Sequence, residues 1–226
     1  MGKRIIKYIK KILYCLVQVI YSGDESCVIC SGYSEESEAL CTVCRKKLRR
    51  SEESFYIGSS EEEYIARSVF YYSSIVKELI IRLKYKNDFI CGEILAKYML
   101  ESVKNNYLEI DLISYVPMTK KAQKNRGYNQ SEFLAKYLAQ FSSIPVICNL
   151  VKTEDTKDQI GLSGDQRWDN MKKCFEIKGS EFIKNKNILL VDDVITTGAT
   201  AFHCAHVLKK NGANNIFILT IAKSNV

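Results

Sequence analysis

The fold is decided by the stretch Val191-Asp192-Asp193-Val194-Ile195-Thr196-Thr197-Gly198-Ala199-Thr200, which continues the apolar run 188–191. The apolar run predicts a strand buried in a sheet, and the Thr-Thr-Gly-x-Thr segment predicts a loop that opens a helix. In open α/β sheets, ligands bind at the carboxyl ends of the strands. The stretch therefore predicts a ligand site at this end of an α/β sheet.

The loop carries the groups that hold a phosphate. Gly198 lets the backbone come close to a ligand, while threonine hydroxyls and backbone amides can donate to phosphate oxygens. The N-terminus of the following helix adds about half a positive charge. A threonine that only caps a helix is the simpler alternative. The residues expected to contact a phosphate are Ile195, Thr196, Thr197, Gly198, Ala199 and Thr200.

Asp192 and Asp193 narrow the choice of ligand. Adjacent carboxylates repel a phosphate unless hydroxyl donors or a cation come between them. Ribose hydroxyls and Mg²⁺ both meet this need. The stretch therefore predicts a phosphorylated ligand that brings ribose hydroxyls, Mg²⁺ or both to the acids. The GxxxxGK[ST] loop of NTPases and the GxGxxG turn of dinucleotide-binding proteins do not occur here.

The region around this stretch alternates short apolar strands with amphipathic helices. We expect strands at 69–72, 112–116, 146–147, 188–191 and 216–219, and apolar helix faces over 76–83, 94–103, 133–141 and 200–210. Gly212 is placed to end the last helix. Continuous apolar strands between helices predict a parallel sheet covered on both faces.

Composition divides the chain into three parts: a basic amphipathic helix in 1–22, a cysteine module with an acidic linker in 23–63, and the α/β domain in 64–226. The net charge of +7 favours anionic partners, or simply a solvated surface. Apolar residues of 3–21 share one helical face, but the apolar stretch 12–20 is too short to span a bilayer. A docked helix is favoured over membrane contact.

Two cysteine pairs predict a metal site. Cys27 and Cys30 are followed, after ten residues, by Cys41 and Cys44, and such CxxC pairs present four thiolates to a structural zinc. A redox pair is the alternative, although redox motifs come singly. Nine cysteines in this arrangement favour a reducing compartment and therefore the cytoplasm. We expect the other five, Cys15, Cys91, Cys148, Cys174 and Cys204, to be buried apolar residues.

Basic segments outside the loop leave alternatives open. The segment 117–130 supplies Lys120, Lys121 and Arg126, which could bind a pyrophosphate or belong to a solvated surface loop. The bases of 45–50 could contact a nucleic-acid backbone or form a solvated helix face. The pair His203 and His206 lies on the helix behind the phosphate loop, where packing on the sheet is favoured over metal binding.

The stretch 191–200 closely resembles the phosphoribosyl diphosphate (PRPP) signature of type I phosphoribosyltransferases. From Cys27 to Ala222 the chain resembles the ComF competence family. The matching segments are the CxxC pairs, 70–72, Leu83-Lys84-Tyr85, the run Arg126-Gly127-Tyr128-Asn129-Gln130-Ser131-Glu132, and the set Gln159, Leu162, Arg167, Asn170 and Phe175. The chain has Ala122 and Gln123 where members of the family carry more arginine.

The resemblance implies a Rossmann-like type I phosphoribosyltransferase fold with a small zinc-knuckle module. It implies that Asp192 and Asp193 bind the ribose hydroxyls of PRPP, that the 195–200 loop binds its 5′-phosphate, and that Mg²⁺ accompanies it. The activity implied is transfer of the phosphoribosyl group to an amine or base nitrogen, linked to DNA uptake. A non-catalytic protein that binds single-stranded DNA and senses PRPP or a nucleotide is the alternative, with a competence helicase as an implied partner.

Overall fold

The computed structural model describes residues 25–35, 38–51, 53–59, 62–106, 109–153 and 174–224. The helix predicted over 3–21, Cys15, and the residues Gln159, Leu162, Arg167 and Asn170 lie outside this described part. The chain divides into two compact units, Met1–Lys47 and Leu48–Val226. The boundaries predicted at residues 22 and 63 stay predictions. In the described ranges, no helix is both long and apolar enough to cross a membrane.

The described part of the first unit is a pair of turns followed by the helix α2 (Thr42–Lys46). A β-bridge joins Ser26 to Tyr33, and the amide of Cys27 donates to the carbonyl of Gly32 at 2.7 Å. Among the described residues of this unit, few apolar side chains are buried: Leu40 and the thiols of Cys27 and Cys44 are among them. The described part of this unit therefore has little apolar core of its own.

The second unit is built on a five-stranded sheet in the order β1-β2-β7-β6-β3. Its strands are β1 (Ser54–Ser59), β2 (Glu62–Tyr71), β3 (Leu112–Tyr115), β6 (Ile188–Ile195) and β7 (Ile216–Lys223). All neighbours are parallel except β1, which pairs antiparallel with β2. A separate pair of short strands, β4 (Leu150–Lys152) and β5 (Phe175–Ile177), completes the set.

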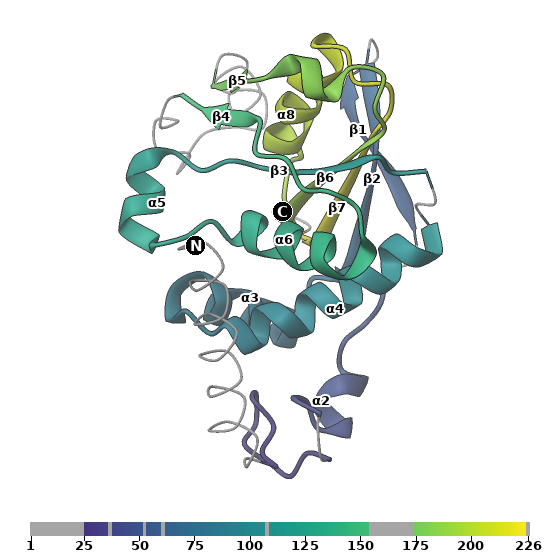
Figure 1. Ribbon diagram of the computed structural model, residues 1–226. Helices are drawn as coiled ribbons and strands as arrows, with labels where there is room; N and C mark the ends of the chain where they lie inside the picture. The colour runs from purple at the N-terminus through teal and green to yellow at the C-terminus, as the bar shows by residue number, and fades with distance from the viewer. Residues whose placement is uncertain are drawn as a thin grey trace, which may run out of the picture. The chain divides into compact units, whose positions relative to one another are not determined.

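Helices cover both faces of this sheet, as Figure 1 shows. The helices α4 (Phe89–Asn106) and α6 (Gln130–Ser142) contact one face, and α3 (Ser74–Lys86) packs on α4. The helix α8 (Ala199–Lys210) contacts the other face, and β5 packs against α8. A parallel sheet needs this double cover because both of its faces are apolar. The predicted α/β class is therefore confirmed.

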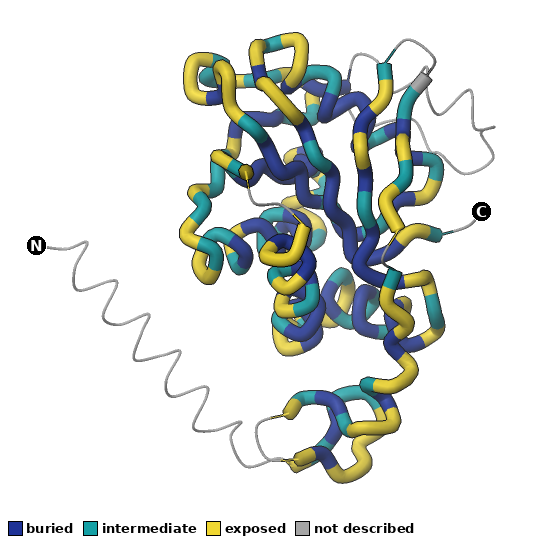
Figure 2. Tube along the Cα trace, turned by 90° about the vertical axis from the view of Figure 1, so that its right-hand side faces the viewer, coloured by how far each residue is buried: buried dark blue, intermediate teal, exposed yellow. Residues whose placement is uncertain are grey.

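The strands at the centre of the sheet are buried on both sides (Figure 2). On β6, Ile188 and Leu190 belong to the apolar core that includes Phe202 of α8. Leu189 and Val191 point to the opposite face and are also fully buried. This alternation on β6 determines where its two acids point.

Several elements differ from the expectation. β6 runs to Ile195, so Asp192 and Asp193 lie inside the strand and not after it, because the backbone pairing with β7 continues. The segment 51–63, predicted as a linker from its acidic residues, contains β1, whose backbone pairs with β2. The predicted loop 117–130 contains the short helix α5 (Lys120–Arg126).

Smaller features also allow a comparison with the predictions made from the sequence. Val146 forms one bridge to Ile113, so the strand expected at 146–147 does not develop. Cys148, expected to be buried, is exposed because it lies in the connection between this bridge and β4, whereas Cys174 and Cys204 are buried as predicted. Gly212 follows α8 with φ of +99°, which confirms its predicted place at the end of the helix.

Candidate functional site

The loop between β6 and α8 surrounds a small pocket of about 50 Å³. Gly198 makes this loop possible because its φ of +83° lies in the left-handed region. A Cβ at this position would also come within 3.1 Å of Ile57 Cγ2. The residues that line the pocket are Asp192, Val194, Ile195, Thr196, Thr197, Gly198, Ala199, Thr200 and Ala201. All six residues predicted to contact a phosphate therefore line one pocket.

The chemistry of this pocket favours an anion. It lies at the N-terminus of α8, a helix of 12 residues, where free backbone N–H groups and the helix dipole favour negative charge. Threonine hydroxyls add further donors. One of them, the Thr197 hydroxyl, accepts weakly from the amide of Ala199 at 3.4 Å. The pocket can thus offer several donors to the oxygens of one phosphate.

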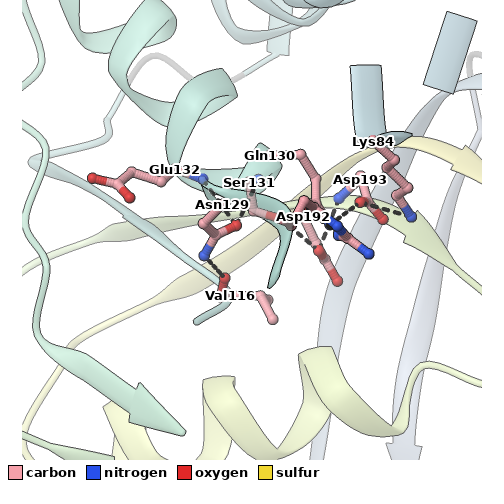
Figure 3. A network of polar contacts seen from close by, with 9 residues as sticks. Lys84, Val116, Asn129, Gln130, Ser131, Glu132, Asp192 and Asp193 are labelled. Atoms are coloured by element: carbon pink, nitrogen blue, oxygen red, sulfur yellow. Dashed lines mark hydrogen bonds and ion pairs between the residues drawn. The ribbon is translucent and has the colours of Figure 1, made fainter. Parts of the chain in front are cut away.

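The paired acids do not share a face of the sheet. Since side chains alternate along β6, Asp192 lies on the side of the pocket and Asp193 on the side of α3 and α6. Asp193 is 5% exposed, whereas Asp192 is partly exposed. The neighbouring strand β3 has ended opposite Val191, and the first turn of α6 lies next to the acids (Figure 3).

Asp193 is bound by two donors from different helices. The ammonium of Lys84, on α3, lies 2.8 Å from Asp193 Oδ2, and the amide of Gln130, on α6, donates to the same oxygen at 2.5 Å. The Gln130 carbonyl in turn accepts from Arg126 Nη1 at 2.7 Å. Burial opposes the charge on Lys84, but the Asp193 carboxylate outweighs this effect and raises the pKa of the lysine.

Asp192 is held by neutral donors and not by an ion pair. The hydroxyl of Ser131 and the backbone amide of Asp193 both donate to Asp192 Oδ1, each at 2.8 Å. Burial, together with the negative charge of Asp193, raises the pKa of Asp192 to about 7. Its two hydrogen bonds and the charge of Lys84 only partly offset this rise. The ionised form of Asp192 is therefore short of positive partners, and it favours a ligand that brings donors.

The run from Arg126 to Glu132 places α6 beside the acids. The Asn129 side chain caps α6 by accepting from the amides of Ser131 at 2.9 Å and Glu132 at 3.4 Å. Its own amide group donates to the carbonyl of Val116, just after β3, at 2.9 Å. This cap fixes the first turn of α6, from which Gln130 and Ser131 reach the two acids.

The predicted pyrophosphate residues have different environments. Arg126 is connected to the acid pair through Gln130, and its guanidinium also lies 5.2 Å from the ring centroid of Tyr85. Lys120 and Lys121 are exposed on α5. The residues that sequence reasoning left without a role are Lys84, Gln130 and Ser131. They lie inside matching runs of the ComF family, but only their long-range contacts show what they do.

The four cysteines of the first unit form a compact cluster. The sulfurs of Cys27, Cys30, Cys41 and Cys44 all lie within 4.8 Å of one another. Cys30 and Cys41 are 3.7 Å apart, close to the spacing of about 3.8 Å that a tetrahedron with zinc–sulfur bonds of about 2.3 Å requires. In the described residues this is the one group of three or more potential metal ligands. The donor set fits a metal such as zinc.

The electrostatics of the cluster also favour a cation. Burial opposes the ionisation of Cys27, but hydrogen bonds from the backbone of Cys30, Cys41 and Ile29 outweigh it and lower the pKa of Cys27 to about 6. Burial and the three neighbouring sulfurs raise the pKa of Cys44 to about 12. Four thiolates can therefore coexist only if a cation lies among them.

Two bases of the segment 45–50 take part in local contacts. In the first unit, Arg45 pairs with Glu38 at 3.2 Å. In the second unit, Arg50 pairs with Glu101, and its guanidinium lies 4.4 Å from the ring centroid of Tyr98. Two bases of the segment 45–50, Arg45 and Arg50, are therefore held in local ion pairs and are not simply solvated.

The two histidines of α8 have different surroundings. His203 is buried, and its ring lies edge-on to that of Phe202 at a centroid distance of 5.2 Å. His206 pairs with Glu62 of β2. The carboxylate of Glu62 also accepts a hydrogen bond from the Tyr64 hydroxyl. The contacts of His206 thus tie α8 to β2.

Comparison with known proteins places the chain among competence proteins. It is 29% identical to competence protein F of Haemophilus influenzae over 222 residues, which cover 88% of this chain and 96% of that protein. It is 26% identical to competence protein ComFC of Streptococcus pneumoniae over 203 residues, 89% of this chain and 82% of that protein. It is also 25% identical to the DNA utilization protein YhgH of Escherichia coli K12, over 88% of this chain and 90% of that protein. No family model matches.

Solved structures similar to the chain include adenine phosphoribosyl transferase from Trypanosoma brucei, with 13% identity and a TM-score of 0.43 over 71% of this chain and 83% of that one. An allosteric regulatory enzyme of purine biosynthesis matches with 21% identity and a TM-score of 0.39. That match covers 57% of this chain, which spans only 25% of that enzyme. The fold class rests on the strand order and on the loop between β6 and α8.

The mostly parallel sheet, the loop between β6 and α8, and the four-cysteine cluster define an α/β protein with an N-terminal cysteine module, as the resemblance to type I phosphoribosyltransferases predicts. The relatives match the chain along most of their length. These relatives, named competence protein F, ComFC and YhgH and 25–29% identical over most of the chain, support the ComF family of competence proteins as the family of this chain.

Proposed function

We propose that the second unit binds PRPP in the pocket between β6 and α8. The observation that carries the proposal is that Asp192 lines the same pocket as the 195–200 loop. A carboxylate beside a group of phosphate donors suits a ligand with hydroxyls next to a phosphate. The 5′-phosphate would accept from the loop amides and threonine hydroxyls, and the ribose hydroxyls would donate to the acid.

The reaction that such a site supports is displacement at C1 of the ribose. The bond from C1 to the pyrophosphate oxygen would break, a bond from C1 to an amine or base nitrogen would form, and that nitrogen would lose its proton to water; Mg²⁺, when bound, would screen the charge of the pyrophosphate. Arg126, with Lys120 and Lys121 on the exposed face of α5, supplies positive charge for this group. The family resemblance supports this part of the proposal, and the acceptor nitrogen is not assigned.

The test is calorimetric titration of the full chain with PRPP in the presence of Mg²⁺. We expect Asp192→Asn to weaken binding at least tenfold, because the neutral side chain loses its charge-assisted bonds to the hydroxyls. Gly198→Ala should have a similar effect, since its φ and the contact with Ile57 both oppose a side chain there. Release of pyrophosphate with candidate acceptors then tests turnover.

Glu63→Gln is the matched control, because it removes an exposed carboxylate from β2, away from the loop residues that line the pocket. It should bind PRPP as the wild type does. Equal affinity in wild type and Asp192→Asn would overturn the proposal. Loss of binding in the Glu63→Gln control would show that the effect is not specific to the pocket.

We further propose zinc as the metal of the four-cysteine cluster, in a structural site closed by four thiolates. A reducing compartment such as the cytoplasm would keep these thiols available. Metal analysis of the purified chain tests this proposal. About one zinc per chain is expected, and Cys44→Ser should lower this content, whereas an unchanged content would contradict the assignment.

A second candidate function is binding of single-stranded DNA. A surface of the second unit favours it: Lys120, Lys121 and Lys124 are exposed on α5, and Tyr85, 69% exposed, offers a ring near Arg126. Exposed bases and an accessible ring are the usual elements of single-strand binding. The relatives are named for competence and DNA utilization. A competence helicase partner stays a prediction from the resemblance.

Fluorescence anisotropy with a labelled single strand at increasing salt tests this candidate. The variant Lys120→Glu with Lys121→Glu should weaken binding and lower its salt dependence, because fewer phosphate contacts release fewer counterions. Lys77→Glu, which changes the charge of an exposed residue on α3, is the control. Binding that is unaffected by the α5 changes would remove this surface from consideration.

A further inference from the structure

The two edges of the five-stranded sheet have different surroundings (Figure 1). At the β3 edge, the segment 145–147 pairs with the strand: the amide of Ile113 donates to the carbonyl of Pro145 at 2.9 Å, and the amide of Ile147 donates to the carbonyl of Ile113 at 2.8 Å. At the other edge, β1 pairs with β2 on one side, and no strand of the described residues pairs with its outer side. The outer backbone groups of β1 therefore form a row of donors and acceptors that fits a further strand.

The sequence of β1 does not oppose such pairing. Edge strands of soluble proteins commonly carry a lysine, a proline or another charge that prevents pairing with a second molecule. β1 reads Ser-Phe-Tyr-Ile-Gly-Ser, without a charged residue or a proline. On the face turned away from α8, Tyr56 is 66% exposed, and Ile65, its neighbour on β2, is 36% exposed. An uncharged edge beside exposed apolar side chains favours a strand partner.

A second copy of the chain can supply this strand about a twofold axis perpendicular to the sheet. Such an axis makes the two copies of β1 antiparallel and keeps each residue on the same face of the sheet in both copies. Residues directly opposite each other in a sheet share a face, so their numbers here must differ by an even amount. One residue of β1 must then lie opposite its own copy, and the choice of that residue fixes the register.

The register with Tyr56 opposite its own copy brings apolar side chains together on both faces. On the outer face, the two Tyr56 rings meet at the centre, and the Ile65 side chain of each copy lies beside them. On the α8 face, Phe55 of one copy lies opposite Ile57 of the other, next to the apolar core that both side chains already contact. Aromatic and β-branched pairs of this kind stabilise neighbouring strands.

The same register matches opposite charges across the axis. It places Ser54 opposite Gly58 of the second copy, and the neighbours of these two residues on β2 are Arg67 and Glu63. Arg67 already reaches toward the edge, because its Nη2 donates to Ser54 Oγ at 2.9 Å. Glu63 is exposed, and Gly58 has no side chain to obstruct it. The two backbones are three strand spacings apart, about 14 Å, which an extended arginine and an extended glutamate span together.

We propose that β1 is a docking edge for a second copy of this chain, in an antiparallel pair centred on Tyr56, and that Arg67 and Glu63 fix the register. An axis through Ile57 would instead place Glu63 in one row with Ile65, where it finds no opposite charge. A strand of six residues is about 20 Å long, so the contact is small for a specific interface and the dimer is reversible. Because each copy uses its one free edge, association stops at the dimer. The proposal does not depend on PRPP binding.

Sedimentation velocity of the full chain, from about 1 to about 200 µM, tests the association. Wild type should change from monomer toward dimer over this range, without larger species. Tyr56→Lys should weaken association at least tenfold, because it places two ammonium groups opposite each other at the centre of the interface. Tyr72→Lys, which changes an exposed tyrosine beyond the end of β2, is the matched control and should associate as wild type does. A wild type that stays monomeric throughout, or a Tyr56→Lys variant that associates equally well, would overturn the proposal.

Charge reversal tests the register. Glu63→Arg and Arg67→Glu should each weaken association about fivefold, because each variant places like charges across the axis at two symmetric positions. The double variant exchanges the two charges and should recover most of the wild-type association, since the pair forms between copies. Thermal unfolding of the monomer in dilute solution checks that each variant is folded. Folded single variants whose losses add in the double variant would show that Arg67 and Glu63 do not meet, and would overturn this register.

Discussion

The chain contains two clusters of groups that carry like charge when ionised. The first unit gathers the four sulfurs of the cysteine cluster within 4.8 Å of one another, and the second places the carboxylates of Asp192 and Asp193 on consecutive residues of β6. The acid pair has a cation of its own, because the Lys84 ammonium lies 2.8 Å from Asp193. In the cysteine cluster the neighbours of Cys44 are sulfurs that raise its pKa.

The difference shows two ways to stabilise concentrated negative charge. A lysine from a packed helix neutralises one carboxylate permanently, so the acid pair can exist before any ligand binds. The thiols need an imported cation, and its binding energy then becomes folding energy. The second unit also has an extensive apolar core, whereas the described part of the first buries few apolar side chains. Metal should therefore matter most for the first unit.

The largest expected effect is the loss of order in the first unit when the metal is removed. Structural zinc contributes about 10 kcal/mol or more in small zinc modules. A strong chelator, or Cys44→Ser, should abolish amide exchange protection in 38–47 and leave protection in 188–195 intact. Hydrogen exchange by mass spectrometry measures both regions in one sample. Cys148→Ser removes an exposed thiol outside the cluster and is the control. Unchanged protection in 38–47 after metal loss would contradict the comparison.

The next largest effect concerns Asp192, which, unlike Asp193, has no lysine in a direct ion pair. In the folded protein the pKa of Asp192 is about 7, above the ordinary value of 3.8. Between these two pH values the folded state therefore keeps a proton that the unfolded state has lost. Wild-type stability should therefore fall between about pH 4 and pH 7, by up to about 1.4 kcal/mol per pH unit from this group. Asp192→Asn lacks this contribution.

Urea unfolding of wild type and Asp192→Asn at several pH values measures the contribution of Asp192 to the pH dependence of stability. The stability of the variant relative to wild type should increase by about 2–3 kcal/mol from pH 5 to pH 7 and then level off. Glu63→Gln, which changes an exposed carboxylate, should show no such trend. A constant difference between Asp192→Asn and wild type across this range would show that Asp192 is not short of positive partners.

A smaller effect is expected on ligand binding and depends on the proposed function. Hydroxyl donors prefer the ionised acid, and a pKa of about 7 means that the ionised fraction of Asp192 grows from pH 6 to pH 8. PRPP affinity should therefore increase about tenfold over this range. Calorimetry on wild type and Asp192→Asn separates this effect from titration of the ligand itself, because both proteins meet the same ligand. An equal pH dependence in the two proteins would exclude Asp192 as the cause.

The smallest effect is expected where the charges are exposed. Arg45 and Glu38 form an ion pair at 3.2 Å beside the cysteine cluster, with side-chain exposures of 38% and 47%. Exposed pairs of this kind contribute less than about 1 kcal/mol. Arg45→Ala should therefore retain the metal content of wild type and change its zinc affinity less than fivefold in a chelator competition. A large loss of zinc would mean that the pair supports the cluster directly.

The sequence predicted the parts of the molecule that local patterns specify. Alternating apolar segments indicated the α/β class, the spacing of the four cysteines indicated their cluster, and Gly198 with its threonines indicated the pocket. Each of these depends on residues that are close in the sequence or on a short repeat. Periodicity and spacing carry that information well.

The separation of the two acids could not be predicted in this way. It requires β6 to continue beyond Val191, and this depends on pairing of Asp192 with Thr220 and of Val194 with Ala222 on β7. The partners of Asp193 come from helices that lie far away in the chain, so its ion pair with Lys84 has no local signal. The strand β1 was missed because its pairing with β2 outweighs an acidic composition.

The alternation along β6 makes the length of this strand part of the site. One residue inserted before Asp192 would exchange the faces of the two acids, placing the ion-paired position toward the pocket and the pocket position toward Lys84. Two inserted residues would restore the faces but displace the loop by about 6.6 Å along the strand. Related chains can therefore exchange apolar residues within β6 far more easily than they can gain or lose a residue there.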